Sequence, residues 1–447
     1  MRFLIGAVLS AVFSGLACAA GIAPSYAEVR GLLAGFADRL PQDLSSTWPS
    51  WISQHDRDIR ARLTGGDADT IVNWLVFGTT FTAHPRVVLD RQGDPAEVGA
   101  LLQARARDLV AALAAPGTDE RRLFARTFLE QAGHRVDTAA ARGALERHLI
   151  AEVVRVAREQ DGHRIALEAA RRKRSGADEF AARSTVFKDR GVSLDTSLLP
   201  GLGLERALAQ MIAGGFLKPG TIRRVAVAGP GLDFADKDAG YDFYPQQTLQ
   251  PFALIDTLLR LRLSDASTLS LTTLDISPRV NDHLRRARER AADGSGYTLQ
   301  LPLEQGAGWK PEVVDYWKRV GSAIGTADAG SAPRGVSRNL TVRTLRVRPE
   351  TIARITVEDL NLVTGRLDGP PFDLIVATNM FVYYDELDQS LALMNVAAML
   401  RPGSFLLANE SLPEIPAVPM RTAGYVTVQY ADDVGKSDHI VWYRRQN

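Results

Sequence analysis

The sequence has almost no cysteine. Cys18 is the single cysteine in 447 residues, so no disulfide can form within the chain, and cysteine usage indicates no redox compartment. The seven histidines show no HExxH or comparable metal-ligand spacing, and the GxSxG and GxxxxGK[ST] motifs are absent. These absences argue against a zinc hydrolase, a serine hydrolase and a nucleoside triphosphatase, and we expect no metal.

Net charge is also nearly absent. Lys and Arg number 53 and Asp and Glu number 52, so no strong field marks the chain as a binder of nucleic acid or of a membrane surface. The basic run Arg171-Arg-Lys-Arg174 follows Glu159 and Glu168, and we interpret it as a solvated helix end rather than a phosphate site. With 45% hydrophobic and 23% charged residues, the composition is typical of a globular protein of two or three domains.

The first 27 residues differ from the rest. Arg2 precedes an apolar run over residues 3–16, and Ala17-Cys18-Ala19 or Ser25-Tyr26-Ala27 would suit a signal peptidase. This pattern predicts a signal peptide and export to the periplasm or the outside. An uncleaved membrane anchor is the alternative, which would give membrane association through the N-terminus only. A wrongly assigned start codon would instead leave the protein cytoplasmic.

Residues 28–183 are predicted to form a helical domain of unknown role. Apolar residues recur at helical spacing in the stretches 101–113 and 145–156, with Arg and Glu on the other faces. Gly65-Gly66 and Pro116-Gly117 are predicted to separate helices. The less polar stretch 70–81, which contains Trp74, is predicted to be core rather than a cofactor site.

Residues 184–447 change to alternating strands and helices. A strand over residues 223–228 enters a turn with Gly229 and Gly231, whose missing Cβ would let the backbone approach a ligand. A structural turn would look similar. A second strand, residues 268–275, ends in Asp275, which is placed to accept hydrogen bonds from ribose hydroxyls. The alternative is that Asp275 only caps the following helix.

The last third of the chain completes the predicted fold. Residues 372–377 form an apolar strand that ends at Thr378-Asn379, where an open α/β sheet places its ligand crevice. A helix over residues 386–400 and a strand over residues 405–410 follow, and then two alternating segments around residues 425–430 and 439–443 make a hairpin. We predict an α/β fold with a Rossmann-like seven-stranded sheet and a C-terminal antiparallel hairpin, preceded by the helical domain.

This plan resembles the class I S-adenosylmethionine-dependent methyltransferases. Within them, Asn361-Leu362, the aspartate-led strand closing in Asn379 and Tyr383-Tyr384, and Leu400-Arg-Pro-Gly403 resemble the chemotaxis-receptor glutamate methyltransferase (CheR-type) family. Residues 184–189 and Gln250-Pro251 resemble its upstream segments. The departures are Thr378 for the family's Arg, Gln250 for its Glu, and a glycine turn that lacks its Ser-Thr-Gly-Glu.

The resemblance implies S-adenosylmethionine as cofactor and assigns residues to it. Asn361 and Leu362 would lie against the adenine, Asp275 would hold the ribose and Asn379 would line the cofactor pocket. Tyr383 would sit beside the transferred methyl as the candidate catalytic residue, although simple packing over the pocket is an alternative.

The sequence therefore supports two hypotheses. The first is a methyltransferase that acts on a protein carboxylate or a small molecule. An ionised carboxylate would need no base, whereas a hydroxyl or an amine must lose a proton. The second is a catalytically degenerate member of the fold that is exported and serves as a binding or scaffold module, because S-adenosylmethionine is made in the cytosol.

Overall fold

The structure is a computed structural model that describes residues 21–87, 94–172, 191–192, 200–235, 242–305, 308–331, 340–432 and 437–447. The predicted leader before Gly21 and the family-like segment 184–189 lie outside the described residues. In the part that is described, no helix is both long and apolar enough to cross a membrane.

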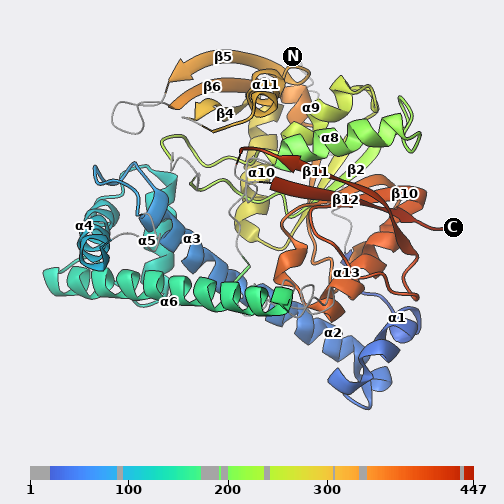
Figure 1. The fold of residues 1–447 in the computed structure, drawn as a ribbon, viewed down its shortest axis with the longest axis horizontal. Coiled ribbons are helices and arrows are strands. Elements are labelled where there is room, and N and C mark those ends of the chain that lie inside the picture. Colours follow the sequence, from blue (N-terminus) through green and yellow to red (C-terminus); the bar gives the residue numbers. More distant parts are fainter. Residues whose placement is uncertain are drawn as a thin grey trace, which may run out of the picture.

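A seven-stranded sheet organises the second half of the chain, as predicted (Figure 1). Its strand order is β11-β12-β10-β9-β2-β3-β7, and the five strands from β10 to β7 run parallel. The strand β12 pairs antiparallel with β10 and with β11, which is the predicted terminal hairpin. The strands are β2 (Arg224–Ala228), β3 (Ser270–Asp275), β7 (Ile355–Asp359), β9 (Phe372–Ala377), β10 (Leu400–Ala408), β11 (Met420–Gln429) and β12 (Ser437–Arg445).

Both faces of the sheet are covered, which explains why the central strands β2 and β9 are mostly apolar. Val225 and Val227 of β2 belong to one hydrophobic cluster, whereas Ala226 and Ala228 belong to another on the opposite face. The first cluster includes residues of α8 (Pro200–Ala213), α9 (Gln250–Arg260) and α10 (Pro278–Ala292). The second includes residues of α13 (Glu386–Met399) and of two helices from the start of the chain, α1 (Tyr26–Leu33) and α2 (Leu44–Ala61).

The start of the chain is therefore part of the sheet's own core. The short strand β1 (Gly21–Ile22) pairs with β8 (Arg366–Leu367), and Ser25 caps α1 in a capping box with Glu28. The 3-10 helix η1 (Ala34–Arg39) joins α1 to α2. Cleavage after Ala19 would keep these contacts, whereas cleavage after Ala27 would remove β1 and the cap.

The next helices form a separate hydrophobic cluster at one side of the molecule (Figure 1). They are α3 (Leu63–Phe77), α4 (Pro95–Ala114), α5 (Glu120–Gln131) and α6 (Ala139–Arg172). Trp74 is fully buried in this cluster, which confirms the stretch as core. Phe234, from the loop after the glycine turn of β2, inserts into the same cluster and joins it to the sheet.

The predicted helix break at Gly65-Gly66 is wrong, whereas Pro116-Gly117 does separate α4 from α5. Both Gly65 and Gly66 lie inside α3, and the break from α2 falls at Arg62. The glycines serve a different purpose, because Gly191 packs against their backbone with no room for a Cβ.

A three-stranded antiparallel sheet that the sequence analysis did not predict lies between α10 and β7. Its order is β4-β6-β5, with β4 (Tyr297–Gln305), β5 (Gly325–Ser331) and β6 (Leu340–Val347). The helix α11 (Pro311–Arg319) connects β4 to β5, and α12 (Pro349–Ile352) leads into β7. Buried Leu299 and Trp317 join this small sheet and α11 to the cluster that covers the main sheet.

Candidate functional site

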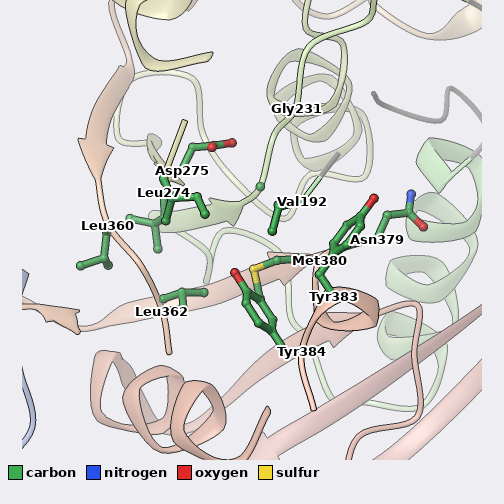
Figure 2. A pocket seen from close by; sticks show the side chains of 12 residues that line it. Val192, Gly231, Leu274, Asp275, Leu360, Leu362, Asn379, Met380, Tyr383 and Tyr384 are labelled. Carbon is green, nitrogen blue, oxygen red and sulfur yellow. The ribbon is translucent and has the colours of Figure 1, made fainter. Parts of the chain in front are cut away.

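A cleft lies at the carboxyl ends of β2, β3, β7 and β9, with an empty space of about 500 Å³ including its open mouth (Figure 2). The register explains the convergence: Ala228 pairs with both Leu274 and Ala377, so the residues that follow lie in one row. This is where an open α/β sheet binds ligands. The lining residues are Val192, Gly229, Gly231, Leu274, Asp275, Ile276, Leu360, Leu362, Asn379, Met380, Tyr383 and Tyr384.

The glycine turn after β2 forms one wall of the cleft. Gly229 and Gly231 have φ of 64° and 65°, a region that glycine adopts without strain. The Gly229 amide donates to the carbonyl of Leu274 at 2.9 Å, which ties the turn to the end of β3. A Cβ on Gly229 would lie 3.7 Å from Met380, so the turn passes close to the loop after β9.

Asp275 contributes a buried carboxyl to the same cleft. Its Oδ1 accepts from the Ser277 amide at 2.8 Å, and its side chain is 6% exposed. Burial raises the pKa of Asp275 to about 7; the amides of Ser277 and Gly231 oppose the shift, and nearby Asp359 adds to it. Asp275 accepts from the amide of Ser277, the N-cap residue of α10, and also faces the cleft; α10 itself begins without a side-chain capping hydrogen bond.

The loop after β9 forms the opposite side of the cleft. Asn379 and Asp275 lie on opposite sides, with Val192 and Met380 between them (Figure 2). Asn379 has a φ of 56°, a left-handed conformation that Asn adopts more readily than most residues. Tyr383 follows in the 3-10 helix η2 (Phe381–Tyr383), so it reaches the cleft from the same side as Asn379.

Six of the seven residues singled out from the sequence line this cleft: Gly229, Gly231, Asp275, Leu362, Asn379 and Tyr383. Asn361 is not among the lining residues. Its Nδ2 donates to Asp56 at 2.9 Å, and its Oδ1 accepts from the Val363 amide at 3.1 Å. Asn361 thus fixes the loop that carries Leu362, and its side chain is already hydrogen-bonded within the protein.

Sequence reasoning missed the helix α2, which joins the strand ends around the cleft. Arg60 donates to the carbonyl of Ile276 at 3.2 Å and pairs with Asp359, at the end of β7, at 2.8 Å. Asp56, one turn earlier, accepts from Arg60 at 2.8 Å and from Thr364 at 2.8 Å. These contacts link α2 to the loops after β3 and β7.

Arg62, at the end of α2, reaches two more parts of the cleft. Its guanidinium donates to the Tyr383 carbonyl at 2.7 Å, and its own carbonyl accepts from the Val192 amide at 3.1 Å. Val192 thereby comes to line the cleft. Amphipathic spacing could identify α2 as a helix, but it carries no signal for where the helix docks.

Gln250 and Thr378, the two departures from the resembled family, turn out to be neighbours. Gln250 Nε2 donates to Thr378 Oγ1 at 2.7 Å. Two family positions that carry opposite charges are therefore replaced here by a neutral hydrogen-bonded pair, so both polar groups keep a partner. The replacement removes two opposite charges, so the net charge is the same, and it leaves neither Gln250 nor Thr378 without a hydrogen bond.

The chain is similar to known proteins over part of its length. No protein-family model matches the chain. A chemotaxis protein methyltransferase of Klebsiella aerogenes is 28% identical over 136 residues, which cover 26% of this chain and 46% of that protein. The chain thus matches less than half the length of this curated relative.

Two methyltransferases are among the solved structures to which this chain is similar. The N-methyltransferase NodS of Bradyrhizobium japonicum is 12% identical, with 56% of this chain and 100% of that chain covered and a TM-score of 0.28. The magnesium protoporphyrin IX methyltransferase of Synechocystis is 12% identical, with 56% and 86% covered and a TM-score of 0.26. The strand order with its terminal hairpin is the class I methyltransferase plan, and the chain resembles the CheR-type family within it.

Proposed function

We propose that this chain binds S-adenosylmethionine in the cleft and transfers its methyl group to an acceptor. The observation that carries the proposal is the position of Asp275, a buried carboxyl that faces the same cleft as the Gly229–Gly231 turn. A carboxylate at the end of the second strand suits the two hydroxyls of a ribose. The CheR-type resemblance supports the same assignment.

The residues present fit such a cofactor. Leu360 and Leu362 supply an apolar surface suited to an adenine ring, and the glycine turn leaves room for the rest of the molecule. Asp275 has no cationic partner among the described residues, so hydroxyl donors from a ligand would stabilise its ionised form.

Methyl transfer requires the protein mainly to align the reacting groups. The bound cofactor would supply a methyl group on a sulfonium, and the acceptor would bond to the methyl carbon in line while the carbon–sulfur bond breaks and the thioether leaves. Asn379, Met380 and Tyr383 would position the reacting groups on the β9 side, and the apolar residues of the cleft would exclude water. In this assignment Tyr383 positions the methyl or the acceptor, and the acceptor is a protein carboxylate or a small molecule.

Calorimetric titration of the purified chain with S-adenosylmethionine and S-adenosylhomocysteine tests the proposal. Asp275→Ala should weaken binding by about tenfold or more, because a charge-assisted hydrogen bond is lost. Asp282→Ala is the matched control, since this exposed acid of α10 pairs with Arg285 at 3.0 Å, away from the cleft. Absence of binding at millimolar cofactor would end the proposal and favour an exported binding or scaffold module.

A further inference from the structure

Two acidic side chains lie next to each other behind the Asn379 side of the cleft. Glu410 follows β10, and neither of its buried carboxylate oxygens has a hydrogen-bond partner. Burial raises the pKa of Glu410 to about 8, and the neighbouring Asp438 of β12 adds to the shift, whereas the backbone amides of Asn379 and of Glu410 itself oppose it. Burial also raises the pKa of Asp438, against the effect of its hydrogen bonds with Tyr430 and Asn409.

The side chain of Asn409 lies between this acid pair and the cleft. Asn379, which lines the cleft, donates its amide to Asn409 Oδ1 at 2.7 Å, and its own Oδ1 accepts from Asn409 Nδ2 at 2.7 Å. Asn409 also lowers the pKa of Asp438, whose Oδ2 accepts from the Tyr430 hydroxyl at 2.6 Å. The acids therefore lie one side chain beyond the cleft wall, after β10 and at the start of β12.

Another buried acid of this chain, Glu205, has cationic partners. Glu205 of α8 pairs with Arg260 at 2.5 Å and with Arg319 at 2.5 Å. Among the described residues, no Lys, Arg or His forms an ion pair with Glu410 or Asp438. A buried acid without hydrogen bonds or counter-charge is costly, and such groups concentrate at sites where a ligand supplies what is missing.

Building on the methyl transfer proposed above, we propose that Glu410 and Asp438 form the acceptor subsite for a protonated amine, which enters past Asn379. An ammonium group would supply the positive charge and the donors that the Glu410 oxygens lack. The neutral Gln250–Thr378 pair is consistent with such an acceptor, because it places no cation beside the cleft to repel it.

The acid pair also provides for the proton that an amine must lose. The bound ammonium passes one proton to the Glu410 carboxylate and becomes a neutral amine. The nitrogen lone pair then forms the bond to the methyl carbon while the carbon–sulfur bond breaks and its electrons go to sulfur. The nitrogen now carries the positive charge, the sulfur is a neutral thioether, and Glu410 later releases its proton to water.

The test is titration calorimetry on the complex with S-adenosylhomocysteine, using three probes of one length: 1,4-diaminobutane, 1,4-butanediol and succinate. We expect only the diamine to bind, and Glu410→Gln to weaken it at least tenfold. Near pH 7 diamine binding should release a proton, seen as a dependence of the heat on the buffer, because the ammonium ionises Glu410. Glu414→Gln is the matched control, since Glu414 is an exposed acid in the same loop.

The outcomes separate this proposal from the one on which it rests. Preference for succinate, or unchanged diamine affinity in both Glu410→Gln and Asp438→Asn, would overturn the amine subsite even if S-adenosylhomocysteine binds. If S-adenosylhomocysteine fails to bind, the same diamine titrations on the ligand-free chain still decide the subsite. Affinity for S-adenosylhomocysteine should be the same in Glu410→Gln and the parent, which verifies that the variant is folded.

Discussion

In the helical cluster, a buried charged side chain is hydrogen-bonded within the protein, whereas at the strand ends a buried acid keeps capacity to bind a ligand. In the helical cluster, fully buried Arg105 donates to the carbonyls of Leu75 at 2.8 Å, His84 at 2.9 Å and Gly78 at 2.5 Å. At the strand ends, burial raises the pKa of Asp275 to about 7. The first arrangement satisfies its charged group within the protein, whereas the second leaves capacity for a ligand.

Asp242 is an acidic side chain that is likewise hydrogen-bonded within the protein. It accepts from the amide and hydroxyl of Thr79 at 3.0 and 2.7 Å, and from those of Thr80 at 3.0 and 2.7 Å. Arg121 likewise donates to the carbonyls of Phe234 and Tyr244. These contacts fasten the loop after the glycine turn to the helical cluster. Burial of a charged side chain by itself therefore does not indicate a functional site.

The largest effect on stability should come from removing Arg105, a buried charge that is hydrogen-bonded within the protein. Arg105→Met leaves several buried carbonyls without donors, so we expect a loss of about 3 kcal/mol or more in the free energy of unfolding of the helical cluster. The midpoint of urea unfolding, followed by tryptophan fluorescence, measures it. A loss below about 1 kcal/mol would show that water replaces the guanidinium and that the comparison overstates its role.

A smaller change in stability, and one of opposite sign, is expected when Asp275 is replaced. Its pKa is raised in the folded protein, so its contribution to stability falls as pH rises from about 4 to about 7. Above pH 7, Asp275→Asn should therefore stabilise the ligand-free chain by about 1–3 kcal/mol. Thermal unfolding at pH 5 and pH 8 checks this, and equal effects at both values would contradict it.

The same residue predicts the pH dependence of binding. Ribose hydroxyls donate to the ionised carboxylate, so affinity for S-adenosylhomocysteine should rise as pH rises towards about 7 and level off above it. In Asp275→Asn this dependence should disappear and the affinity should be lower throughout. A wild-type profile that stays flat between pH 5 and pH 8 would remove Asp275 from the binding step.

The smallest effect should come from α2. Arg60→Ala breaks contacts to Ile276 and Asp359 without touching the cofactor, so we expect affinity for S-adenosylhomocysteine to fall about three- to fivefold, or about 1 kcal/mol. Arg57→Ala is the matched control, because exposed Arg57 contacts Gln54 and Ser53 of its own helix. Equal affinities in the two variants would show that α2 packs beside the cleft without ordering it.

The sequence predicts the central sheet because its strands can be recognised from their local patterns of residues. Residues 372–377 are a nearly continuous apolar run, broken by Asp373, and the structure places β9 at those residues. The terminal hairpin is likewise confirmed, although β11 begins at Met420, earlier than its alternating pattern suggested. The strand-end position of Asp275 and Asn379 follows from the same local signals, because parallel strands end at one edge.

What the sequence could not predict depends on docking between distant segments. The three-stranded sheet lies in a region whose strands carry charged residues such as Arg343 and Arg346, which obscure alternation. Asn361 matched a family motif, yet its side chain is occupied by Asp56, a residue 305 positions earlier. The unpaired state of Glu410 is visible only once β10 and β12 are adjacent.

The contacts of α2 also determine when the cleft can form during folding. His55 meets Asp388 across 333 positions, and Arg62 meets the Tyr383 carbonyl across 321. During synthesis the helix emerges early, but its partners appear only when most of the chain has left the ribosome. Such high contact order slows folding, so the cleft should be among the last features to form. A truncated or interrupted chain would then accumulate helices with no binding site.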